Sequence, residues 1–142
     1  MAMILSYALI LYAVLLGGAY LFLVDLAWYK LERVVPVFDS FPDELIEHRN
    51  WALFAYCYIV ELIFFVFIPS FVYYWFYSVL PVSGFRGGVA VGLFLFLLGF
   101  VPYAILILFR IKIPVVFLLY QSTGLLIKIV GSLAIIGYLY SL

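Results

Sequence analysis

Four long apolar runs constrain this chain more than any other feature of its sequence. They cover about residues 3–29, 51–77, 88–109 and 115–140, and each is near the roughly 20 residues that a helix needs to cross a bilayer. In a bilayer the backbone polar groups must be satisfied within the protein, so such runs are expected to be helices. We therefore predict an all-α integral membrane protein in which four transmembrane helices form a single bundle over residues 1–142.

Composition agrees with a membrane protein and argues against several functions. Of the 142 residues, 70% are hydrophobic and 10% are charged, which leaves too little polar surface to cover a soluble domain. The expected partner is therefore the lipid bilayer. Seven basic and seven acidic residues cancel, so we expect no nucleic-acid partner. Cys57 is the only cysteine and His48 the only histidine, so we expect no disulfide, no metal site and no cofactor. No catalytic constellation is recognisable.

The connections between the runs predict the orientation of the bundle. Residues 30–50 form a polar first loop, in which the stretch from Ser40 to Asp43 is typical of a helix start outside the bilayer. Basic residues near helix ends favour the cytoplasmic side. Arg86 is the only one on the face that carries the second loop, whereas loops 1 and 3 carry five: Lys30, Arg33, Arg49, Arg110 and Lys112. We predict cytoplasmic loops 1 and 3 and outward termini, in a multi-pass protein of a prokaryotic inner or cell membrane.

Polar residues inside the apolar runs are the candidates for a functional site. Glu61 and Lys128 are each the only charged residue in their run, and a central charge costs roughly 2.5–3.5 kcal/mol on membrane insertion. At ~1.5 Å per residue they lie about 15 and 20 Å from the cytoplasmic ends, so we predict that they pair. Asp25 and Gln121 lie closer to the cytoplasm, which extends the pair into a polar ladder. The ladder either fixes the helix register or forms a proton or substrate site.

Small residues and prolines in the runs predict how the helices pack. Six glycines are candidates for helix contacts: Gly84, Gly88, Gly92, Gly99, Gly124 and Gly131. The first four form one stripe that lets a neighbouring backbone approach closely, and the last two share a face with Lys128. Pro69 and Pro102 fall inside the second and third runs, where each removes a backbone hydrogen bond and predicts a kink.

Two short stretches carry a resemblance to a known family. HRNWALF contains Arg49 and Asn50, and FRIKIP contains Arg110 and Lys112. With its four helices and polar first loop, the chain resembles the membrane-associated eicosanoid and glutathione metabolism proteins. The resemblance implies a trimer that binds glutathione at the cytoplasmic interface, where these four residues lie. The chain departs from the family pattern because Leu53 replaces an acid and no tyrosine accompanies Arg110 and Lys112.

Three functions stay open on the sequence. The first is a non-enzymatic accessory subunit of a membrane assembly or homo-oligomer, favoured by the glycine-rich helix faces. The second is a small transporter or channel that uses the intramembrane ladder. The third is a glutathione- or lipid-handling membrane enzyme of the four-helix type, which the resemblance implies.

Overall fold

Helices make up every regular element that the structure describes. The computed structural model describes residues 2–34, 42, 44, 50–76, 79, 82 and 84–141, with the side chains of residues 2–6 left aside. Four of its helical segments are long and apolar enough to cross a membrane. This confirms the four predicted spans and suggests a multi-pass membrane protein. The helix start predicted from Ser40 to Asp43 lies outside the described residues, except for Pro42.

The spans are built from eight elements, two of which are π-helical turns. In chain order they are α1 (Ala2–Val34), α2 (Trp51–Leu62), η2 (Ile63–Phe67), α3 (Ile68–Phe76), α4 (Gly84–Leu95), η3 (Phe96–Phe100), α5 (Val101–Arg110) and α6 (Val115–Tyr140). α1 continues five residues beyond the expected end at residue 29, and α4 begins four residues before the expected start at 88. α1 extends because Lys30, Glu32 and Arg33 are adequate helix formers, so the helix outlasts the apolar run.

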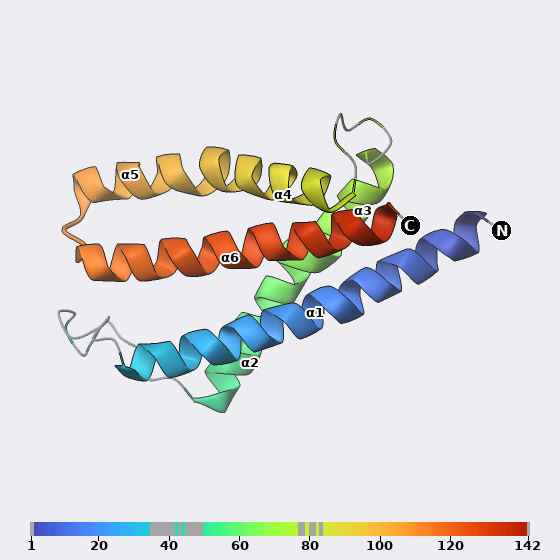
Figure 1. Cartoon of the computed structure of the whole chain (residues 1–142). Coiled ribbons are helices and arrows are strands. Elements are labelled where there is room, and N and C mark those ends of the chain that lie inside the picture. Colours follow the sequence, from blue (N-terminus) through green and yellow to red (C-terminus); the bar gives the residue numbers. More distant parts are fainter. Residues whose placement is uncertain are drawn as a thin grey trace.

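The spans run in alternating directions. The start of α1 and the end of α6 therefore lie at the same end of the bundle (Figure 1). α1, α6 and the α4–α5 segment lie roughly side by side, while the α2–α3 segment crosses them at an angle. The main buried cluster lies near the end where the chain terminates, between α1, α3 and α6. It contains Ala13, Tyr73, Leu133 and Ile136.

Both π-helical turns stand directly before a proline. η2 precedes Pro69 and η3 precedes Pro102, each proline being the second residue of the following helix. Proline has no backbone N–H, and its ring collides with the carbonyl four residues earlier in a regular helix. A wider turn with i→i+5 bonds moves that carbonyl away from the ring. The irregularity predicted at the two prolines therefore takes the form of π-helical turns.

Glycines bring α4 and α6 into close contact. An ideal Cβ at Gly88 would collide with the carbonyl oxygen of Leu133, and one at Gly92 would lie 2.8 Å from the Cα of Val130. Gly84 begins α4 with a φ of +72°, a conformation that side chains with a Cβ rarely adopt. The backbones of the two helices can therefore approach as the glycine spacing predicts.

Gly99 corrects the expected glycine stripe. It is exposed, and no atom from another part of the fold lies within 4 Å of an ideal Cβ at this position. Gly99 belongs to η3, whose i→i+5 bonds change the angular register relative to Gly88 and Gly92. The packing stripe consequently ends before η3.

Candidate functional site

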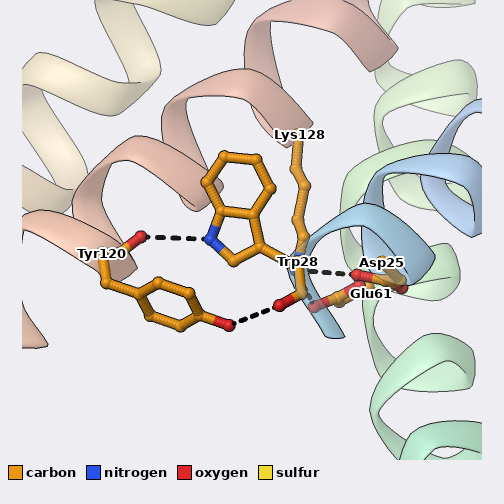
Figure 2. Close-up of polar contacts among 5 residues, drawn as sticks. All are labelled: Asp25, Trp28, Glu61, Tyr120 and Lys128. Carbon is orange, nitrogen blue, oxygen red and sulfur yellow. Dashed lines mark hydrogen bonds and ion pairs between the residues drawn. The ribbon is translucent and has the colours of Figure 1, made fainter. Parts of the chain in front are cut away.

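Three charged residues from three different helices meet inside the bundle. Lys128 Nζ of α6 donates to Glu61 Oε1 of α2 at 2.5 Å and lies 2.9 Å from Asp25 Oδ1 of α1. The side chains of Lys128, Asp25 and Glu61 are only 12%, 9% and 19% exposed, respectively. We call these residues the charged triad (Figure 2). It contains the Glu61–Lys128 contact that their similar depths predict.

Asp25 occupies a different place from the one expected. The sequence suggested a rung of the ladder close to the cytoplasmic end, whereas Asp25 contacts Lys128 directly. Asp25 lies nine residues before the end of α1 at Val34, about 14 Å at ~1.5 Å per residue. The packing of α1 against α6 places it beside Lys128. The three charges form a compact cluster rather than a descending ladder.

The triad contains two carboxylates for one ammonium group. Asp25 reaches the ammonium group through Oδ1 and Glu61 through Oε1. Glu61 Oε2 is buried and has no hydrogen-bond partner within the described part of the chain. If both carboxyl groups are ionised, the triad carries one excess negative charge at a depth where an unbalanced charge is costly. The arrangement can therefore hold one further proton or small cation.

A cavity of about 220 Å³ adjoins the triad. Glu61 and Lys128 form part of its wall, together with Trp28, Cys57 and Gln121. Gln121 was expected as a rung of the ladder, but its side chain is exposed and makes no hydrogen bond to the triad within the described residues. It lines the cavity instead.

The two sides of the triad along the bundle differ in burial. Cys57 and Gln121 line the cavity, are exposed, and lie between the triad and the end of the bundle where α2 and α6 begin. Beyond the triad, Val66, Ser132 and Ile136 are fully buried. Ser132 lies one helical turn from Lys128, and its Oγ has no hydrogen-bond partner within the described residues. A layer of buried side chains thus separates the triad from the other end.

Trp28 and Tyr120 fasten α1 to α6 beside the triad. The Trp28 indole Nε1–H donates to the Tyr120 carbonyl at 3.3 Å, and the Tyr120 hydroxyl donates to the Trp28 carbonyl at 3.1 Å (Figure 2). An ideal Cβ at Gly124 would lie 2.7 Å from Trp28 Nε1, so Gly124 makes room for the indole. These hydrogen bonds and the indole packing hold α1 and α6 together at the level where Asp25 meets Lys128.

Sequence reasoning missed Trp28 and Tyr120 as parts of the site. Trp28 follows Asp25 by three residues, while Tyr120 and Gly124 precede Lys128 by eight and four. These intervals place the residues on the same helix faces as the triad. The signal was available in the spacing, but an aromatic residue near a helix end is equally typical of an interfacial anchor.

Gly131 accommodates a second aromatic contact on α6. An ideal Cβ at Gly131 would collide with the Tyr20 hydroxyl group. That hydroxyl donates to the Ile127 carbonyl at 2.8 Å. Gly131 therefore serves the α1–α6 contact, as Gly124 does about two turns earlier.

The residues expected at the cytoplasmic interface do not form a described site. Asn50 Oδ1 accepts from the Leu53 backbone N–H at 2.8 Å, which makes Asn50 the N-cap of α2. Arg110 and Lys112 are exposed around the α5–α6 connection. Arg49 lies outside the described residues. The structure thus gives Asn50 a capping contact, while the predicted interface site stays a prediction.

Comparisons with protein-family models, curated proteins and solved structures find no match for this chain. The charged triad and the cavity beside it are the features of the chain that bear on its function.

Proposed function

We propose that the protein is a small transporter or channel that moves protons or small monovalent cations, with the charged triad as its central site. The observation that carries the proposal is the meeting of Asp25, Glu61 and Lys128 within the spans, beside a cavity of about 220 Å³. Ionisable residues inside membrane spans are rare, and they mark ion pathways and proton relays. The excess carboxylate provides the negative charge that attracts such an ion.

Lys128 supplies a way to bind and release the transported ion. Its ammonium group lies between two carboxylates, at 2.5 Å from one and 2.9 Å from the other. A small displacement strengthens one of these ion pairs and weakens the other. The carboxylate that loses the ammonium group then takes up a proton or cation, and it releases the ion when Lys128 returns.

Passage across the membrane also requires a conformational change on the side of the triad where Val66, Ser132 and Ile136 are buried. The buried side chain of Val66 belongs to η2, which follows Glu61 by two residues. π-helical turns occur frequently at functional sites and have weaker regular bonding than an α-helix. We assign the gate to the layer formed by Val66 and Ile136, with Ser132 as the next polar group beyond it.

The proposal includes the orientation predicted from the basic residues, with loops 1 and 3 in the cytoplasm and the termini outside. The cavity then opens toward the cytoplasm, because Cys57 and Gln121 lie on the side where α2 and α6 begin. Lys30 and Arg33 at the end of α1 support this orientation through the excess of basic residues on that side.

Flux measurements in proteoliposomes test the proposed transport. A potassium gradient with valinomycin sets the membrane potential, and an internal pH dye reports proton entry; sodium and potassium are assayed separately. We expect flux from the wild type and the background of empty vesicles from Glu61→Gln and Asp25→Asn. Glu44→Gln, an exposed acid outside the spans, is the matched control and should keep wild-type flux. Background flux of all three ions through the wild type, or full flux through Glu61→Gln, contradicts the proposal.

Assembly is a second candidate function, which a different observation favours. In the most apolar part of the Trp51–Phe76 span only 6% of the residues are buried, compared with 39% in Val115–Tyr140. Much of this span therefore faces away from the interior of its own chain, although Val66, Ser70 and Tyr73 are buried. We propose that the exposed face of the second span, which includes Phe64, contacts further copies in a homo-oligomer or partner membrane subunits of a larger assembly.

The mass of the purified protein in detergent tests the assembly candidate. Native mass spectrometry should give a defined oligomer or a co-purifying subunit. Phe64→Ala, at a position 61% exposed in the second span, should weaken that assembly. Tyr103→Ala in the third span, 64% exposed, is the matched control. A monomeric wild type without a partner contradicts this second candidate.

A further inference from the structure

An apolar groove lies between α4 and α6, away from the charged triad. Its volume is about 520 Å³, and its walls include Phe85 and Val89 of α4 and Val130 and Ala134 of α6. Tyr20 of α1 also lines the groove, but its hydroxyl already donates to a backbone carbonyl. The groove thus suits a hydrocarbon chain rather than a polar ligand.

The groove is about as long as one leaflet of a bilayer is thick. Phe85, Val89 and Leu93 line it at four-residue spacing, so they share one face of α4. The eight-residue interval from Phe85 to Leu93 gives a rise of about 12 Å. Half of the ~30 Å hydrocarbon core is about 15 Å. A helix from a second copy would cross the whole core, whereas this groove fits a chain that ends near the midplane.

A positive charge stands at the outer end of this groove. Arg86 is exposed in the first turn of α4 and shares a face with Val89 and Leu93 through the intervals i, i+3 and i+7. The positive end of the α4 macrodipole lies at the same place. Among the described residues, the other basic side chains belong to the triad or to the opposite end of the bundle.

We propose that the groove binds one acyl chain of an anionic phospholipid, whose phosphate pairs with Arg86. The chain follows the face of Phe85, Val89 and Leu93 from the end of the bundle to the depth of Leu93. A guanidinium group can bind a phosphate through two parallel hydrogen bonds, which gives the site a preference for the headgroup. The site is independent of the proposed transport and keeps its lipid if the triad is neutralised.

Lipid titration followed by native mass spectrometry tests this site. The full chain is purified in detergent, delipidated, and titrated with phosphatidylglycerol or with phosphatidylcholine of the same acyl chains. We expect one phosphatidylglycerol per chain, bound about tenfold more tightly than phosphatidylcholine. Arg86→Gln should remove this preference while both lipids still bind weakly. Lys30→Gln, which removes an exposed charge at the other end of the bundle, should preserve it.

Filling the groove separates a specific lipid site from general lipid contact. Val89→Trp and Leu93→Trp should each abolish tight binding of both lipids; Leu93 is already 42% exposed, so the second variant places its ring without disturbing the core. Equal binding of the two lipids by the wild type overturns the proposal, as does tight phosphatidylglycerol binding by Leu93→Trp. Conversion of a dimer to a monomer by Leu93→Trp, without loss of bound lipid, identifies a second copy as the occupant and also overturns it.

Discussion

Replacing Lys128 with methionine should destabilise the protein more than removing either of its acidic partners. Lys128 lies 2.5 Å from Glu61 and 2.9 Å from Asp25, and both carboxylate side chains are at most 19% exposed. Lys128→Met therefore leaves two buried carboxylates without a cation. Removing one member of a buried ion pair typically costs about 3–5 kcal/mol, and we expect a loss of that order.

The two acidic variants should be milder because each leaves one ion pair intact. Glu61→Gln keeps the 2.9 Å contact between Lys128 and Asp25, and Asp25→Asn keeps the 2.5 Å contact with Glu61. Each variant exchanges one charged contact for a neutral one, so the expected loss is that of one charge-assisted hydrogen bond, about 1.5–3 kcal/mol. The triple variant contains no buried charge and should be more stable than Lys128→Met alone.

Reversible unfolding by sodium dodecyl sulfate in mixed micelles measures these differences. Tryptophan fluorescence reports the unfolding; replacing Trp51 and Trp75 with phenylalanine leaves Trp28, beside the triad, as the single reporter. We expect the triple variant to lose much less free energy of unfolding than the sum of the three single-variant losses. Equal losses in Lys128→Met and Glu61→Gln, or additive losses in the triple variant, would refute a shared triad.

Three further predictions concern packing, capping and orientation. Gly88→Ala should lower the free energy of unfolding in detergent by about 1–3 kcal/mol, because the new Cβ would meet the Leu133 carbonyl. Gly99→Ala, with open space around it, should leave that free energy unchanged or raise it slightly. Asn50→Ala should lose about 1 kcal/mol in the same measurement, and Asn50→Asp should retain stability because it still caps the Leu53 N–H. A phosphatase fused to the C-terminus should be active and a cytoplasmic reporter at the same site silent; the reverse pattern contradicts the proposed orientation.

The four spans could be predicted from the sequence because the cost of exposing backbone and polar groups to lipid depends on local composition. A long apolar run therefore favours a membrane-spanning helix whatever the fold of the rest of the chain. The Glu61–Lys128 contact was also accessible, since each is the only charge in its run and both count to similar depths. Their energetic coupling stays a prediction until the variants are measured.

The tertiary structure alone decided which faces of the helices meet. Asp25 joins the triad because α1 packs against α6 with Asp25 beside Lys128, an arrangement that the apolar run does not specify. Gly99 leaves the glycine stripe because a π-helical turn before Pro102 changes the register. Hydrophobicity along a segment favours its insertion into lipid, but it is nearly uniform around α1 and α6 and so does not select their contact faces. The contacts are therefore selected by steric fit between helices, through Gly88 on α4 and through Trp28 over Gly124, and such fit exists only once the segments are assembled.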